Sequence, residues 1–206
     1  MSASFNPGND NGLESADSAA AHGRSRQSVG HENQPIYVAN AGMVLLWPFL
    51  HRYYELLGLV RENAFIDFDS RSRAVYLLHS LASGRTAYHE AELPLAKVMC
   101  GIAPSTLLAA ASEGEPDARE QAVSEELLGG VRQNWDKLRN TTTEGLRESF
   151  LMRNGRLVRD ESGTGRNWTL IVEAKAYDVL LDTLPWRIST IQLSWMTGML
   201  AVQWRR

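Results

Sequence analysis

The sequence predicts an α+β fold in which a helical N-terminal half packs with a mostly antiparallel C-terminal sheet. Apolar residues recur at helical spacing as far as about residue 153, and they alternate with polar residues in several short runs after it. Residues 1–35 differ from the rest, because Ser, Asn, Gly, Ala and Asp dominate and large apolar side chains are few. We therefore expect a disordered N-terminal arm over residues 1–35 and a single globular α+β domain over residues 36–206.

Composition and charge exclude several classes of protein. The chain has 206 residues, of which 44 % are apolar and 22 % charged, and its net charge of −3 does not favour binding to nucleic acid. Cys100 is the only cysteine, so the domain must rely on packing rather than on disulfides. The sequence shows no signal peptide and no apolar run of the roughly 20 residues that a membrane span needs. We expect synthesis in the cytoplasm and no membrane span.

The N-terminal half begins with a short strand and continues as helices. Ile36–Val38 consists of β-prone residues, and apolar residues at helical spacing follow from Met43 to Gly58. Pro48 interrupts this pattern and must cap, kink or restart the helix, because proline has no N–H donor. Similar patterns predict further helices over Arg71–Ser83, Leu93–Cys100, Asp117–Leu138 and Leu146–Arg153.

Local signals mark both ends of the last of these helices. Thr141 and Glu144 fit a capping box, in which each side chain satisfies a free backbone N–H group of the first turn. Asn154-Gly155 is suited to end the helix in a left-handed conformation. We therefore expect the change from helix to sheet at this point.

Alternating apolar residues after Asn154 predict strands. Arg156–Arg159 and Trp168–Glu173, with the polar segment Asp160–Arg166 between them, have the pattern of a β-hairpin. The remaining segments are one short helix and a second strand pair, expected over Tyr177–Leu184 (ended by Pro185), Ile188–Leu193 and Met199–Trp204.

No pattern of reactive residues predicts catalysis, a cofactor or a metal site. His89-Glu90 with Glu92 is the nearest approach to a metal cluster, and a solvated helix start with favourably placed acidic residues is the preferred interpretation. Cys100 ends an apolar helix, so a buried structural thiol is favoured over a nucleophile, although Lys97 lies one turn away and is placed to lower its pKa. The glycines around residues 155–165 are not followed by Gly-Lys-Ser/Thr and indicate a hairpin turn rather than a phosphate-binding loop.

Tryptophans give the richest signal in the C-terminal half. Trp168 and Trp204 lie on expected strands, and we interpret them as core residues. Trp186 follows a proline, and Trp195 lies beside Met196 in a connection, where burial by the same domain is harder. We predict that Trp186, Trp195 and Met196 contact a protein partner, with packing in the core as the alternative for the two tryptophans.

Eight stretches in collinear order, distributed over nearly the whole range of residues 36–206, together resemble one known family. They are Ile36–Leu50, Arg73–Leu78, Glu92–Gly101, Trp135–Leu138, Gly145–Arg153, Tyr177–Trp186, Leu193–Met196 and Val202–Trp204. The sequence resembles the tape measure protein family of contractile injection systems, the phage-tail-like particles that bacteria assemble and release. The resemblance implies a structural role in tail assembly without enzymatic activity or cofactor. It also implies tail tube, baseplate hub or cap proteins as partners, assembly in the cytoplasm and incorporation into a released particle.

The chain lacks the long helical segment that a ruler needs. Even 206 helical residues would reach only roughly 300 Å, and a stretched arm of about 35 residues covers no more than roughly 120 Å. We therefore expect the globular anchoring module of the family, inside or at the end of the tail tube, with the measuring segment shortened or supplied by another chain. An assembly adaptor or chaperone is the main alternative, and an enzyme that uses Cys100 or His89 is the third. The sequence leaves the formation of a homo-oligomer open.

Overall fold

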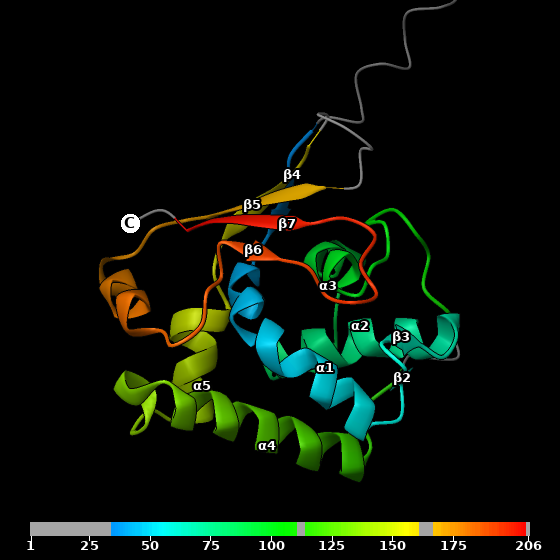
Figure 1. The fold of residues 1–206 in the computed structure, drawn as a ribbon, viewed down its shortest axis with the longest axis horizontal. Helices are drawn as coiled ribbons and strands as arrows, with labels where there is room; N and C mark the ends of the chain where they lie inside the picture. Colours follow the sequence, from blue (N-terminus) through cyan, green and yellow to red (C-terminus); the bar gives the residue numbers. More distant parts are fainter. Residues whose placement is uncertain (1–33, 111–113, 161–166, 205–206) are drawn as a thin grey trace, which may run out of the picture. The chain divides into compact units, whose positions relative to one another are not determined.

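Most helices of this chain precede a mostly antiparallel sheet, as the sequence predicts. The computed structural model describes residues 34–110, 114–160 and 167–204, and the arm expected over residues 1–35 lies outside them except for its last two positions. The predicted α+β class is confirmed, since one strand of a five-stranded sheet opens the domain and most helices come before the other four strands (Figure 1). The domain boundary near residue 35 stays a prediction.

The first helical segment is divided at Pro48. Strand β1 (Ile36–Val38) leads into the 3₁₀ helix η1 (Ala41–Leu46), and α1 (Trp47–Leu56) follows directly. Pro48 lies in the first turn of α1, where backbone N–H groups have no hydrogen-bond acceptor within the helix. The missing N–H group of proline therefore costs the helix no hydrogen bond. Of the three options left open by the sequence, the proline therefore restarts the helix.

A small hairpin follows that the apolar pattern does not predict. β2 (Val60–Arg61) and β3 (Ala64–Phe65) pair antiparallel. Their turn residues Glu62 and Asn63 have positive φ angles of 50° and 68°, which suit the right-handed twist of a tight hairpin. Strands of two residues are too short for alternation to be visible in the sequence.

Helix α2 (Phe68–Ser83) begins before its predicted start at Arg71. Asp67 caps it, because its side chain accepts a hydrogen bond from the Ser70 N–H group at 2.7 Å. The helix ends at Ser83, the predicted last residue, and Gly84 caps it with a φ angle of 70°. An aspartate at the N-cap is a start signal of its own, and it lies upstream of the first apolar residues of the buried face.

The next two helices lie close to their predicted positions. α3 (Pro94–Met99) falls within the expected range, and α4 (Ala118–Asn134) begins at the capping residue Asp117. α4 ends before the predicted Leu138, because Trp135 takes extended backbone angles and its ring is fully buried at 4.8 Å from the Phe150 ring. Two short 3₁₀ helices belong to this part of the chain, η2 (Glu90–Glu92) and η4 (Asp136–Leu138).

Helix α5 (Thr143–Leu146) starts one residue away from the predicted cap. Thr142 caps it by accepting a hydrogen bond from the Gly145 N–H group at 3.0 Å. The predicted capping box of Thr141 and Glu144 is therefore wrong. Consecutive threonines offer the same cap chemistry, and only the backbone angles decide which one is used.

The predicted left-handed end at Asn154-Gly155 is also wrong. The helix continues as the π-helix η5 (Arg147–Leu151) and ends at Met152. Gly155 already lies in a strand, where a Cβ atom would be 2.8 Å from both Ala41 Cβ and Ile171 O. Glycine is therefore needed at position 155 because β4 lies very close to Ala41 and Ile171, and not because the chain turns there.

The sheet has the strand order β1-β4-β5-β7-β6. The predicted hairpin is confirmed as the antiparallel pair β4 (Gly155–Arg159) and β5 (Trp168–Val172). The second predicted pair is also antiparallel, although β6 (Thr190–Ile191) is shorter than expected beside β7 (Leu200–Trp204). β5 and β7 pair in parallel, and η6 (Ala176–Thr183) lies in the crossover between them as a 3₁₀ helix.

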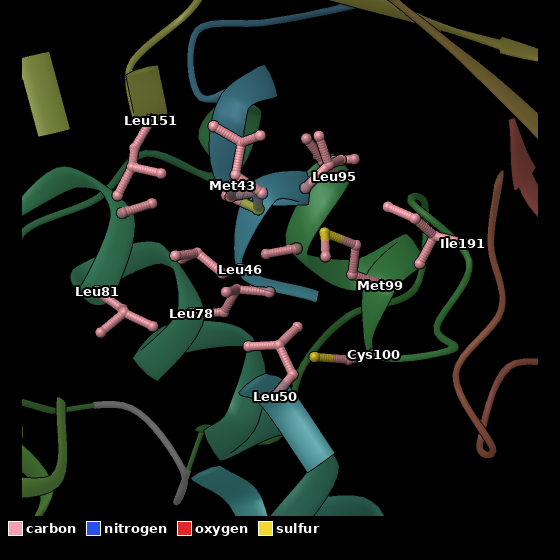
Figure 2. Close-up of a cluster of buried hydrophobic side chains, with 14 of the residues drawn as sticks. Met43, Leu46, Leu50, Leu78, Leu81, Leu95, Met99, Cys100, Leu151 and Ile191 are labelled. Atoms are coloured by element: carbon pink, nitrogen blue, oxygen red, sulfur yellow. The ribbon is translucent and has the colours of Figure 1, made fainter. Parts of the chain in front are cut away.

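The helices α1 to α5 lie on one side of the sheet (Figure 1). The face of the sheet toward them carries buried residues such as Leu157, Leu170 and Leu200. Figure 2 shows part of the core, to which η1, α1, α2, α3, η5 and β6 contribute Met43, Leu46, Leu50, Leu78, Leu81, Leu95, Met99, Cys100, Leu151 and Ile191. Burial of such side chains is the main force that holds the two layers together.

Candidate interaction surface

Trp195 lies in the core and not on the surface. Its side chain is 6 % exposed, and its Nε1–H group donates to Met99 O at 2.9 Å. The rings of Phe65, Tyr54 and His51 surround it at centroid distances of 4.9, 5.6 and 5.8 Å. Core packing, the alternative that the sequence leaves open, therefore describes this side chain, and its burial does not support a partner contact through Trp195.

Gly101 allows the Trp195 segment to approach α3. The φ angle of Gly101 is 73°, in the left-handed region that favours glycine. A Cβ atom at this position would lie 2.6 Å from Trp195 O. A side chain at position 101 would thus strain its own backbone and push the Trp195 segment away.

Trp186 is half-buried and joined to the helical half by a reciprocal pair of hydrogen bonds. Its Nε1–H group donates to Leu45 O at 3.1 Å, while the Nε1–H group of Trp47 donates to Arg187 O at 2.8 Å. The Phe49 ring meets the Trp186 ring edge to face, with centroids 5.2 Å apart. Because both indole N–H groups are bonded within the chain, the partly exposed rings present apolar faces to the solvent.

An exposed cation lies next to Trp186 in the chain. Arg187 follows Trp186 directly, and no carboxylate of the described residues forms an ion pair with its guanidinium group. Tryptophan and arginine are the side chains most enriched at the centres of protein interfaces. We define the Trp186 surface as Trp47, Phe49, Trp186 and Arg187.

The other residues singled out from the sequence lie outside this surface. Met196 is half-buried, and its sulfur accepts a hydrogen bond from the Leu193 N–H group at 3.5 Å. Trp168 and Trp204 pack against the core, as predicted for both. Partner contacts of Trp186 and Met196 stay predictions. Trp47 is not predicted as a site residue from the sequence, since its only local signal is its position before Pro48 at the start of a helix.

A buried ion pair holds the segment that leads to Trp186, and no local pattern in the sequence predicts it. Arg153 and Asp178 meet through two contacts of 2.6 and 3.0 Å, and both side chains are almost fully buried. Trp204 Nε1–H donates to the same carboxylate at 3.1 Å, and Arg153 also donates to Glu173 O at 2.7 Å. We name this pair the Arg153–Asp178 clasp, and it ties the end of η5 to η6 and β7.

Opposing effects set the pKa of Asp178. Burial raises the pKa, whereas hydrogen bonds from Arg153, the Lys175 N–H group and Trp204 lower it, and together they hold it below its ordinary value. The carboxylate is therefore charged in the folded protein near neutral pH. Its negative charge balances the buried guanidinium group, which would be strongly destabilising without a counter-charge.

The family model of the contractile injection system tape measure protein matches residues 4–204 of this chain. The chain belongs to this family. The resemblance seen in the sequence is confirmed, and the family gives the chain a structural role in a contractile injection system. No curated protein and no solved structure matches it.

In this member of the tape measure family, the thiol considered for chemistry lies in the core. Cys100 is fully buried, and burial raises its pKa to about 12. The expected lowering of the Cys100 pKa by Lys97 is not found. The Lys97 ammonium group instead bonds the Glu90 carboxylate, Pro104 O at 3.2 Å and Thr106 O at 2.9 Å. It therefore fixes the loop after α3 and does not activate the thiol.

His89 lies at a helix start, as the preferred interpretation of the sequence has it. The backbone N–H group of His89 donates to the Glu92 carboxylate at 2.8 Å at the beginning of η2. Among the described residues, no three His, Cys, Asp or Glu side chains are grouped so that they could hold a metal ion. Within the same ranges, no helix combines the length and the apolar character needed to cross a membrane.

Proposed function

We propose that this tape measure family member is an anchoring module, a non-catalytic component that docks at one end of the tail tube or inside it. Assembly takes place in the cytoplasm, and the protein stays in the released particle. Its partners are tail tube, baseplate hub or cap proteins. Trp186 and Met196, both half-buried, are the predicted contacts that keep some accessible surface.

The shortness of the helices supports an anchor over a ruler. The longest helix of the described residues, α4, has 17 residues and is about 26 Å long at 1.5 Å per residue. From Ile36 to Trp204, the described residues are largely used in helices and strands that pack around one core cluster. A chain folded in this way spans too short a distance to act as a ruler for the tail. It offers neighbouring proteins a rigid surface instead.

Deletion of the gene tests the proposal. We expect a deletion strain to produce tails of the wrong length or none, and the full chain supplied in trans to restore them. Tail lengths in purified particles are measured by negative-stain electron microscopy. Particles of normal length and number from the deletion strain would contradict a role in assembly.

Quantitative mass spectrometry of purified particles separates the anchor from an assembly adaptor or chaperone. An anchor remains in the finished particle at a fixed ratio to the tube protein. A chaperone acts during assembly and is then absent, although its deletion still damages the particles. Absence from particles would therefore favour the adaptor.

A variant with both Cys100→Ala and His89→Ala tests the non-catalytic part of the proposal. We expect particles of normal length, because the thiol is buried and His89 begins a short helix. Thermal unfolding of the purified variant shows whether it folds. A folded variant that fails to support assembly would point to chemistry at one of these residues.

A further inference from the structure

The rings of the Trp186 surface are already fixed before any partner binds. Two hydrogen bonds join the indole groups of Trp47 and Trp186 to carbonyl oxygens on opposite segments, and the Phe49 ring of α1 packs edge to face against Trp186. Side chains that are rigid in the free protein lose little conformational entropy on binding. Half-buried aromatic rings of this kind contribute more to an interface than mobile side chains of the same area.

Arg187 defines the chemistry of the partner. It is exposed, follows Trp186 in the chain and has no ion pair within the described part of the chain. Its own carbonyl oxygen accepts the Trp47 hydrogen bond, so the backbone at Arg187 is tied to the start of α1. An exposed guanidinium group matches a carboxylate, because its N–H groups form paired hydrogen bonds to both oxygens.

We propose that the Trp186 surface docks into an apolar socket bordered by a carboxylate on a different protein of the same particle. The inference rests on the proposed function, since it names the partner chemistry of the anchor. The aromatic rings fill the socket, and Arg187 binds the carboxylate at its border.

A second copy of the chain fits this role less well. The large exposed apolar side chains of the described residues are spread over the chain, and only Ile66 and Phe68 belong to one segment; the others are Tyr37, Leu107, Val179 and Met199. A proline-rich peptide is also disfavoured, because the indole N–H groups that would bind its carbonyl oxygens are bonded within the chain.

Charge reversal at Arg187 tests the proposal in the full chain. Arg187→Glu removes only an exposed side chain, so thermal unfolding should be unchanged. We expect about tenfold less protein in particles from a complemented deletion strain, because a carboxylate would face a carboxylate. The matched control is Arg61→Glu on β2, which reverses the charge of another exposed arginine and should leave incorporation unchanged.

Trp186→Ala should lower incorporation by about thirtyfold, as expected for a residue at an interface centre. Because Trp186 also packs within the chain, the variant's unfolding temperature is measured alongside. Arg187→Glu keeps the proposal testable if the tryptophan variant fails to fold.

Carbodiimide coupling in intact particles identifies the bordering group. With Arg187→Lys, the lysine amine should form an amide with an Asp or Glu of another particle protein, and mass spectrometry locates that residue. Arg61→Lys should give no such product. Coupling only between two copies of the chain, or none to any carboxylate, would overturn the proposal.

The two proposals fail in different experiments. Normal incorporation of Arg187→Glu, with abnormal tails still present in the deletion strain, overturns the docking surface and leaves the anchor standing. Normal tails in the deletion strain overturn the anchor itself.

Discussion

Trp186 and Trp195 lie in neighbouring connections of the same sheet, yet their surroundings differ. Each indole donates to a backbone carbonyl of the helical half, Leu45 O for Trp186 and Met99 O for Trp195. Trp195 has three aromatic neighbours and is 6 % exposed, whereas Trp186 has one aromatic neighbour and remains half-buried. The two indole groups thus form the same kind of hydrogen bond, and they differ in how far the ring is enclosed.

This difference separates a stabilising role from a surface role. Both residues pack against α1, Trp186 through Phe49 and Trp195 through His51 and Tyr54. Enclosure on all sides makes Trp195 part of the core, because removing it would leave a cavity. Partial enclosure leaves Trp186 with an accessible apolar face beside Arg187.

Removing each ring gives the largest expected contrast. Trp195→Ala should lower the free energy of unfolding by about 4 kcal/mol, because a large side chain leaves a closed core. Trp186→Ala should lower it by about 1–2 kcal/mol, because part of its area is exposed in the folded protein. Urea unfolding followed by circular dichroism measures both values. Equal losses would show that the two rings are enclosed alike.

Breaking the Arg153–Asp178 clasp should have the next largest effect. Asp178→Asn leaves the buried guanidinium without its counter-charge, and we expect a loss of about 3 kcal/mol at neutral pH. The folded pKa of Asp178 lies below its ordinary value of 3.8, so the stabilisation is present above that pH. It is lost as the pH falls through the folded pKa, and the difference between wild type and variant should shrink there.

Asp136→Asn is the control for the clasp. Asp136 forms an ion pair with Arg139 at 2.6 Å, but both side chains are mostly exposed. Exposed pairs contribute little, and we expect a change of less than about 1 kcal/mol. A loss at Asp178 as small as that at Asp136 would mean that the clasp does not hold the Trp186 segment in place.

Glycine substitutions test how Trp195 reaches the core. Gly101→Ala should lower the free energy of unfolding by about 2–3 kcal/mol, because a left-handed angle and a contact of 2.6 Å with Trp195 O act together. Gly58 has nearly the same φ angle, 74°, with nothing within 4 Å of an added Cβ atom. Gly58→Ala should thus lose only about 1 kcal/mol. Thermal unfolding compares the two variants. An equal loss would show that the close contact between Gly101 and the Trp195 segment does not contribute to stability.

The smallest expected effect concerns the hydrogen bond of Trp186. Trp186→Phe keeps an aromatic ring against Phe49 and removes the donor to Leu45 O. We expect a loss of about 1 kcal/mol in urea unfolding, the usual value of one hydrogen bond. A loss of several kcal/mol would place Trp186 among the core residues with Trp195.

Local sequence signals predict much of the fold. Helical spacing locates α1 to α4, and the alternation after Asn154 locates β4, β5 and the β6–β7 pair. The predictions fail where neighbouring residues have similar chemistry, as at Thr141 and Thr142, or where an element is too short to show a period, as in β2 and β3. They also fail at Gly155, where the glycine is needed by a segment far away in the chain.

The candidate site is less predictable than the fold. Trp186 is singled out by its position after a proline, but Trp47 and Arg187 become part of one surface only through hydrogen bonds that join distant segments. Trp195 also lies in a connection between expected elements, and its local sequence does not show that it is buried. The left-handed turn at Gly101 is what lets the Trp195 segment approach α3.

The sequence by itself determines the α+β class, the order of most elements and the family, because spacing, caps and collinear motifs are properties of neighbouring residues. Tertiary structure alone decides which tryptophan is enclosed, which arginine meets Asp178 and which glycine permits a close approach. These outcomes depend on contacts between residues far apart in the chain, and such contacts exist only after the layers have packed.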